Sequence, residues 1–192
     1  MPNLPTSPLL ALLEIMQPLS TELREELEQL MRQEHLARGT QLLQPGQVAH
    51  RLYFVERGVV RGFYLKDGRD VSSWFMKEND FIISIVSFFT QTPSLEYVEL
   101  LEDATLWSLS YAQLQHLYQR FPEFNAIGRR LTENYYVLSE RRTLNLRLQS
   151  APARYEQLLT DFPAIFQRVP LKHIASHLGL TPETLSRLRA RR

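Results

Sequence analysis

The sequence predicts an α+β protein in which an antiparallel β-barrel precedes a set of helices. Turn signals recur every ten to twelve residues, at Pro45-Gly46, Arg57-Gly58, Asp67-Gly68 and Asn79-Asp80. The runs between them are short and rich in aromatic and β-branched side chains, as in a β-sandwich or barrel. From Tyr111 onward the apolar residues recur at helical spacing instead. This change of period divides the chain into a β-rich part and a helical part.

The elements of the first part follow from local patterns. Residues 9–16 and 20–33 carry apolar side chains at helical spacing, and Ser20 is a suitable N-cap for the second of these helices. The expected strands cover residues 52–55, 59–65, 71–75, 97–101 and 105–109. Asp67-Gly68 lies between two of these runs and is the strongest hairpin signal in the chain.

The last stretch, residues 170–192, has the pattern of two short helices joined at a glycine. One face of the first helix is apolar and consists of Leu171, Ile174, Ala175 and Leu178. Gly179 stands where a residue without Cβ turns left-handed at low cost, and Thr181 is a good N-cap for the second helix. That second helix has a polar, basic side. The pattern indicates a helix-turn-helix, with an ordinary basic helical hairpin as the alternative.

Charge divides the chain in the same way. Residues 1–110 hold 9 Lys and Arg against 15 Asp and Glu, a balance of −6, whereas residues 111–192 hold 13 against 6, a balance of +7. The basic part indicates an anionic partner, and double-stranded DNA is the natural candidate. No apolar run approaches the ~20 residues that span a bilayer, and no secretion signal is visible. We therefore expect a cytoplasmic protein with no membrane partner.

A long helical pattern at residues 123–148 has no internal proline and carries one apolar stripe. The members of the stripe are Ile127, Leu131, Tyr135 and Leu138. Such a stripe packs either on the chain's own core or against a second copy of the helix. Because a DNA-binding protein that spans two half-sites needs two recognition helices, we expect this stripe to form a homodimer interface.

Taken together, these features resemble the cyclic-AMP receptor protein/Fnr family of transcription regulators. The resemblance depends most on Leu52-Tyr-Phe-Val-Glu-Arg-Gly58, Asp80-Phe-Ile82 and the stretch from Ile174 to Leu188. It implies a double-stranded β-helix, or jelly-roll-like, sensor barrel with flanking helices in residues 1–121. It further implies a dimerisation helix in residues 122–149 and a winged-helix-like helix-turn-helix in residues 150–192. Contact with RNA polymerase is also implied.

The same resemblance assigns roles on the second helix of the helix-turn-helix. The base-contacting positions of the family are occupied by Glu183, Ser186 and Arg187. The chemistry agrees, because arginine binds the O6 and N7 edge of guanine and glutamate accepts from the N4 amine of cytosine. A TGA-like half-site is implied, although Pro182 stands where the family often has an arginine, which leaves the outer base open. Phosphate contacts, which position without specifying, are expected from Thr181, Thr184 and Arg189.

The effector site departs from the family pattern. Where cyclic-AMP binders carry a Gly-Glu pair, this chain has Ile83 and Ser84, and no arginine lies between Arg69 and Arg120. A phosphate without a counter-charge is costly to bury, so we expect the barrel not to depend on cyclic AMP. The chain has no Cys for an iron–sulfur cluster, and His50 alone does not establish a haem ligand, so no cofactor is expected. The remaining apolar residues form packed core or, alternatively, a pocket for an unidentified small-molecule effector, lined by Phe75, Phe81, Ile83, Ile85 and Phe88.

The predicted function is DNA binding by a homodimeric transcription regulator rather than catalysis. The sequence contains no phosphate-cradling glycine loop, nucleophile elbow or H-E-x-x-H motif. His173 and His177 have a spacing compatible with a metal, but a third ligand is not apparent. We expect both on the side of their helix that faces solvent or the DNA backbone, and we predict no metal site. Two alternatives stay open: a ligand-binding or interaction module whose helix-turn-helix no longer recognises DNA, and a barrel enzyme acting on a small molecule.

Overall fold

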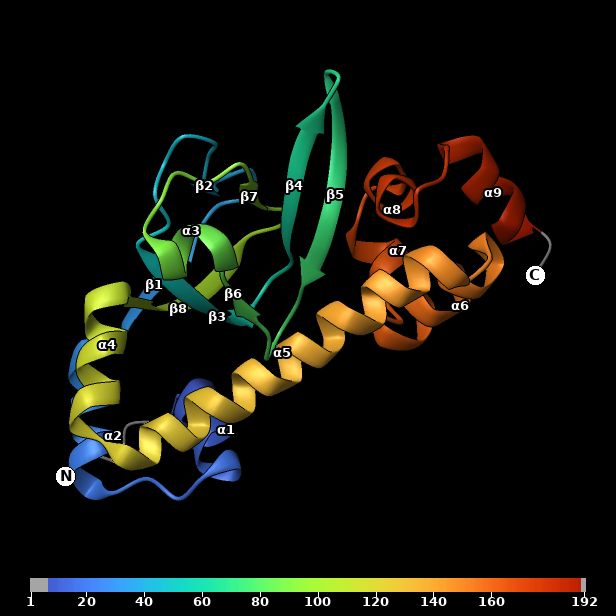
Figure 1. Ribbon diagram of the computed structural model, residues 1–192. Helices are drawn as coiled ribbons and strands as arrows, with labels where there is room; N and C mark the ends of the chain where they lie inside the picture. Colours follow the sequence, from blue (N-terminus) through green and yellow to red (C-terminus); the bar gives the residue numbers. More distant parts are fainter. Residues whose placement is uncertain (1–6, 191–192) are drawn as a thin grey trace.

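The computed structural model describes residues 7–190 of the chain. Helices α1 (Pro8–Met16) and α2 (Thr21–Leu30) come first, and strands β1 to β8 follow. Helix α3 (Ile85–Thr90) interrupts the strands, and α4 (Tyr111–Arg120) succeeds them. The long α5 (Pro122–Leu148) then leads to the C-terminal helices (Figure 1), which are α6 (Ala151–Asp161), α7 (Ile165–Arg168), α8 (Leu171–Leu178) and α9 (Pro182–Ala190).

Two antiparallel sheets form the barrel. One has the strand order β1 (Arg32–Leu36), β8 (Ala104–Ser110), β3 (Arg51–Arg57), β6 (Phe81–Ile82). The other has the order β2 (Gln41–Leu43), β7 (Tyr97–Leu100), β4 (Val60–Lys66), β5 (Arg69–Met76). Neighbours in each sheet are mostly distant in sequence, so the chain passes back and forth between the sheets in a jelly-roll-like manner. The predicted α+β class and the barrel are confirmed.

The hairpin of β4 and β5 follows the sequence prediction closely. Lys66 pairs with Arg69, which leaves Asp67-Gly68 as a two-residue turn. Their φ angles are 51° and 72°, and this pair of positive values is what a type I′ turn requires. The hairpin extends beyond the rest of the barrel and lies beside the C-terminal helices (Figure 1).

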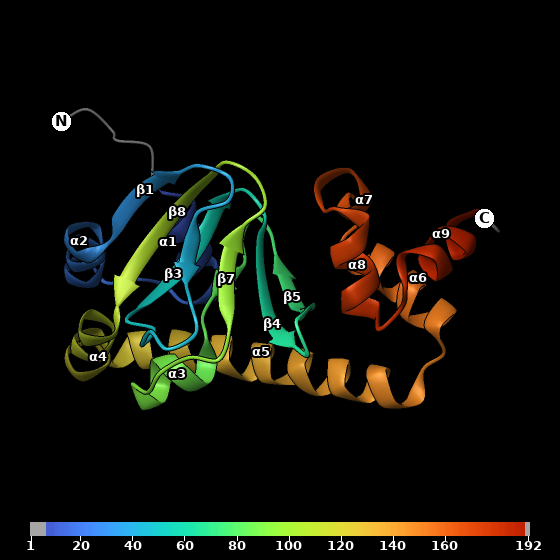
Figure 2. The same cartoon turned by 90° about the horizontal axis from the view of Figure 1, so that it is seen from above.

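The barrel core continues into the helices that flank it. Leu23 and Leu27 of α2, Phe54 of β3, Leu106 of β8 and Ile127 of α5 belong to one cluster, and none has exposed surface. Full burial of a large apolar side chain contributes roughly 1.5–3 kcal/mol. The start of α5 is therefore part of the barrel core, while its later turns run on to the C-terminal helices (Figure 2). No helix within residues 7–190 has the length and apolar content of a membrane span.

Some local predictions were incomplete. The helix expected over residues 20–33 ends at Leu30, because Met31 is extended and Arg32–Leu36 pairs with β8 as a strand. This strand is polar on both faces, so no apolar alternation marked it in the sequence. In residues 150–190 the structure contains helices and no strand, so the helix-turn-helix carries no wing there.

Candidate nucleic-acid interface and barrel pocket

The turn between α8 and α9 has the predicted geometry. Gly179 is left-handed, with φ of 68° and ψ of 34°. The Leu180 N–H donates to the Ala175 carbonyl oxygen at 2.8 Å, which closes the end of α8 in the manner of a Schellman motif. The hydroxyl of Thr181 accepts from the Thr184 N–H at 3.2 Å, so Thr181 caps α9. A glycine and a threonine in these places determine the angle between the two helices.

The apolar face of α8 anchors α9. Ile174, Ala175 and Leu185 have no exposed surface, and Leu178 is 2% exposed. Because Ala175 carries only a methyl group, the two helices approach each other closely at that point. With Leu185 fixed inward, the opposite side of α9 faces solvent.

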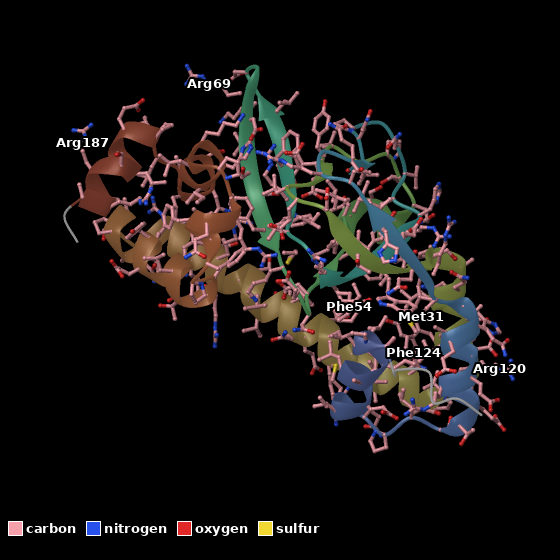
Figure 3. The ribbon with its side chains drawn as sticks, turned by 180° about the vertical axis from the view of Figure 1, so that it is seen from behind. Met31, Phe54, Arg69, Arg120, Phe124 and Arg187 are labelled. Atoms are coloured by element: carbon pink, nitrogen blue, oxygen red, sulfur yellow. The ribbon has the colours of Figure 1, made fainter. Side chains whose placement is uncertain are left out.

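That outer side of α9 carries the predicted base-contacting residues, since Glu183, Ser186 and Arg187 are all exposed. The pKa of the Glu183 carboxyl lies below its usual range, because its own backbone N–H and the Thr181 hydroxyl donate to it. The carboxylate is therefore an acceptor at neutral pH, as contact with a cytosine amine requires. Arg187 projects from the surface (Figure 3), and its Nε lies 3.5 Å from the Glu183 carbonyl oxygen.

The three residues predicted to contact phosphates are placed differently from one another. The hydroxyl groups of Thr181 and Thr184 form a hydrogen bond at the start of α9, with 3.1 Å between their oxygens. The guanidinium of Arg189 lies 4.6 Å from the centre of the Phe166 ring of α7. Stacking occupies the face of the guanidinium and leaves N–H donors on its edge for an anion.

The two histidines of α8 contradict the prediction that they face solvent. His173 is 7% exposed and lies beside Arg61 and Asp70 of the barrel. His177 packs on Phe75, with ring centroids 5.1 Å apart, and its Nδ1 is 3.4 Å from Arg142. Burial is the main cause that lowers their pKa values, to about 4 for His173 and about 3 for His177. The β4–β5 hairpin covers a second side of α8. The polar residues on that side of the helix give no sign in the sequence that they are covered.

The stripe predicted as a dimer interface faces the chain's own barrel over most of its length. Ile127 has no exposed surface and Leu131 packs against the same core. The Phe81 N–H donates to the Tyr135 hydroxyl at 2.8 Å. Leu138, in contrast, is 47% exposed. For Ile127 the dimer prediction is therefore wrong, and the alternative left open by the sequence, packing on the chain's own core, applies.

A different apolar face of α5 is uncovered. Val137, Leu144 and Leu148 are 45%, 50% and 79% exposed and follow each other at seven and four residues, which places them on one side of the helix. This face is not evident from the sequence, because Glu133, Glu140 and Arg141 are interspersed with its apolar residues. The stronger stripe in the sequence was the one that the barrel buries.

The predicted effector pocket does not form as a single pocket. Phe81 packs on Phe54 at 5.3 Å between ring centroids, and Phe88 is buried against Phe89 and Tyr111. Phe75 lies against His177, and Ile85 is 54% exposed. Because residues 85–90 are helical, their side chains point in different directions instead of lining one strand face. Of the five predicted residues, Ile83 lines a cavity of about 470 Å³, together with Leu43, Val48, His50, Ile82 and Val98.

The positions that hold a cyclic nucleotide in the resembled family carry different side chains in this chain, and several of these contact one another. Ser84 and Ser94 lie hydroxyl to hydroxyl at 3.3 Å. Glu96 is 8% exposed and accepts from the Trp74 indole N–H at 3.2 Å. The indole lies directly on Gly62, where an added Cβ would overlap the ring. The segment aligned with the phosphate-binding residues thus carries a buried carboxylate that the Trp74 ring contacts, while Ile83 and Ser84 line the cavity.

One cation reaches this region from α5, which the sequence analysis did not foresee. Burial lowers the pKa of Arg142, and the nearby Tyr64 and Glu96 act in the opposite direction. The Tyr64 hydroxyl donates to Glu96 at 2.8 Å, so the carboxylate and its donors already satisfy one another. A cyclic phosphate would have to displace these contacts and lie beside Glu96, so the residues present do not fit it.

Comparison with known proteins identifies the class of the barrel. Residues 33–121 match the family model of the cyclic nucleotide-binding domain. Among curated proteins, none matches the sequence. The β-rich part of the chain therefore matches a cyclic nucleotide-binding domain in sequence, although the residues around Glu96 do not suit a cyclic phosphate.

Solved structures extend the comparison to the whole chain. The c-di-GMP-responsive global regulator CLP of Xanthomonas campestris is 20% identical, with a TM-score of 0.68 over 90% of this chain and 91% of that one. FixK2 of Bradyrhizobium japonicum is 19% identical, with a TM-score of 0.69 over 84% and 83%. A variant of CooA from Carboxydothermus hydrogenoformans is 19% identical, with a TM-score of 0.66 over 94% and 83%. The fold of the chain is that of the Crp/Fnr transcription regulators.

Proposed function

We propose that the protein is a Crp/Fnr-type transcription regulator that binds a two-fold symmetric DNA site as a homodimer in the cytoplasm. The main support for the proposal is that Glu183, Ser186 and Arg187 are exposed together on the outer side of α9. Its three polar side chains are exposed on a helix whose inner side is fixed by Leu185. An arginine and an ionised glutamate one turn apart offer a donor for guanine and an acceptor for cytosine.

The dimer is proposed to form along α5. Val137, Leu144 and Leu148 present apolar surface that the chain itself does not cover, and a parallel copy of the helix would bury it. Two-fold symmetry would then place two recognition helices in successive major grooves, ~34 Å apart. The same family resemblance supports contact with RNA polymerase through the barrel.

The effector, if one is used, is proposed to be other than cyclic AMP. The contacts around Glu96 and Trp74 are incompatible with a cyclic phosphate, whereas the cavity at Ile83 has the volume of small-molecule sites. Its lining combines apolar side chains with Gln47, His50, Arg51 and Ser84, so it suits a molecule that has both apolar and polar groups.

A substitution of Arg187 by alanine tests the proposal. We expect the variant dimer to bind a duplex with two inverted TGA-like half-sites at least about 30-fold more weakly, since each half-site loses an arginine base contact of about 1–3 kcal/mol. Fluorescence anisotropy at a fixed, stated salt concentration measures this. Arg38→Ala, which removes an exposed arginine of the barrel, serves as the matched control.

The opposite result would favour the alternative of a helix-turn-helix that no longer recognises DNA. In that case the native protein binds a scrambled duplex as tightly as the symmetric one, and Arg187→Ala behaves like Arg38→Ala.

A further inference from the structure

The C-terminal helices are packed on the barrel as well as connected to it by α5. The second hydrophobic cluster contains residues of both parts: Val59 and Leu101 of the barrel, and Phe162, Ile165, Val169 and Ile174 of the helices. Val59, Ile165 and Ile174 have no exposed surface. Parts of a chain that move freely relative to one another seldom share an apolar core. This cluster therefore restricts the motion of the helix-turn-helix.

A buried arginine lies at one side of this cluster. Arg61 of β4 is 2% exposed and donates to Asp70 at 2.7 Å and to Glu99 at 2.5 Å. Its guanidinium also contacts Nδ1 of His173 on α8. Since the pKa of His173 is lowered to about 4, the imidazole is neutral near pH 7 and can accept from the arginine. The barrel thus supplies a charged hydrogen-bond donor, Arg61, and His173 of α8 supplies one of its acceptors.

Ser176 of α8 holds the backbone of β5 directly. Its hydroxyl donates to the Asp70 carbonyl oxygen at 2.9 Å and accepts from the Ser72 N–H at 2.9 Å. Strand β5 is at the edge of its sheet, where backbone groups lack a strand partner. The helix therefore completes the hydrogen bonding of an edge strand.

A second arginine that joins the two parts belongs to the C-terminal helices and lies near Phe162 of the cluster. Arg168 of α7 donates to both carboxylate oxygens of Glu78, each at 2.7 Å, and also pairs with Glu102. These hydrogen bonds lower the pKa of Glu78 to about 2. Glu78 in turn accepts from the Gly58 N–H at 2.9 Å. Bidentate pairs of this kind fix orientation as well as distance.

The packing leaves the recognition face free. Within the described chain, the contacts of Glu183, Ser186 and Arg187 are with residues of α9 and its cap, and all three side chains are exposed. Arg187 points away from the barrel (Figure 3). The contact between barrel and helices therefore positions α9 without covering it.

We propose that this docking interface, formed by Val59, Arg61, Asp70 and Glu78 of the barrel with Phe162, Arg168, His173 and Ser176, locks the helix-turn-helix at one position on its own barrel in the absence of an effector. In a symmetric dimer, the lock sets the separation of the two recognition helices. This consequence for DNA rests on the proposed function. Loosening the lock lowers affinity for a duplex that engages both helices and leaves affinity for a single half-site unchanged, because only the former depends on preorganisation.

The position of the helix-turn-helix is measured first, without DNA. The chain has no Cys, so Arg38→Cys and Thr160→Cys introduce two spin labels, one on the barrel and one on α6. Pulsed electron spin resonance, on labelled chains diluted with unlabelled ones, is expected to give one narrow distance distribution. Ser176→Ala and Arg168→Gln are each expected to broaden it. Arg69→Ala, at the tip of the same hairpin (Figure 3), is expected to leave it narrow.

The same variants are then titrated with a symmetric duplex and with a single half-site. Ser176→Ala removes one hydroxyl from a partly exposed position, so it tests the lock even if Arg168→Gln folds poorly. We expect at least about tenfold weaker binding to the symmetric duplex and equal binding to the half-site. Unchanged distance distributions in both variants would overturn the proposal, as would broadened distributions with undiminished affinity for the symmetric duplex. If the native protein shows no sequence preference, the proposed function fails, while distributions that broaden in the variants still support the lock.

Discussion

His177 is packed between Phe75 of β5 and Arg142 of α5. Burial, aided by Arg142, lowers its pKa from 6.5 to about 3. In the unfolded chain the imidazole binds a proton near pH 6.5, whereas in the folded chain it does not. Its contribution to stability is therefore complete above about pH 6.5 and is lost as the pH falls toward 3. His173, with a pKa of about 4, acts in the same direction.

A glutamine at position 177 tests this assignment. The free energy of unfolding of the native protein should fall on acidification from pH 7 to pH 5, and His177→Gln should reduce that fall by roughly 1–2 kcal/mol. Urea denaturation at a series of pH values gives the slope. Equal slopes in the two proteins would show that the pKa of His177 is the same in the folded and unfolded states, which would contradict the lowered pKa.

Single residues also show where sequence reasoning succeeds. Gly179, Thr181 and the Asp67-Gly68 turn were predicted correctly, because backbone conformation at these positions depends on the residue itself. His173 and Ser176 could not be placed, because their partners, Arg61 and the β5 backbone, are more than one hundred residues away in the chain. The residue type at one position does not predict which residue, distant in the sequence, will contact it in the fold.

Among the elements, α5 shows the same limit. Its helical period and its length followed from the sequence, but an apolar stripe records burial and not the partner that buries it. The stripe that begins at Ile127 packs on the barrel, and the uncovered face lies elsewhere on the helix. Strands β1, β2 and β6 were not predicted because they are short or polar and depend on pairing with β8, β7 and β3. The five residues of the candidate pocket do not line one cavity, because Ile85 and Phe88 lie on helix α3, where one is exposed and the other is buried.

The proposed dimer makes a prediction at the level of this helix. The double substitution Val137→Glu and Leu144→Glu places two charges on the uncovered face of α5, so we expect monomers where the native protein forms dimers. Sedimentation velocity at several protein concentrations measures the change. Ile15→Glu, at an apolar residue of α1 that is 84% exposed, is the control and should leave the dimer intact. A double variant that sediments as the native dimer would place the interface elsewhere.

In the molecule as a whole, the barrel keeps the fold of a nucleotide-binding domain and not its phosphate site. Saturating cyclic AMP should therefore leave the melting temperature unchanged. A ligand present at 100 times its dissociation constant would add about 2.7 kcal/mol, which raises the melting temperature of a chain of this size by several degrees. Differential scanning fluorimetry distinguishes the two outcomes. A rise of several degrees would mean that Glu96 and Trp74 move aside for the phosphate.

In the whole molecule, α9 is exposed on a helical unit that packs on the barrel, and its proposed role in DNA recognition can be measured directly. Purified protein, with no ligand and at a stated salt concentration, is used to select bound sequences from a pool of random duplexes. We predict enrichment of a two-fold symmetric site with TGA-like halves, and loss of that enrichment when Arg187→Ala is used instead. A pool that stays random with the native protein would contradict the proposal that this chain recognises DNA by itself.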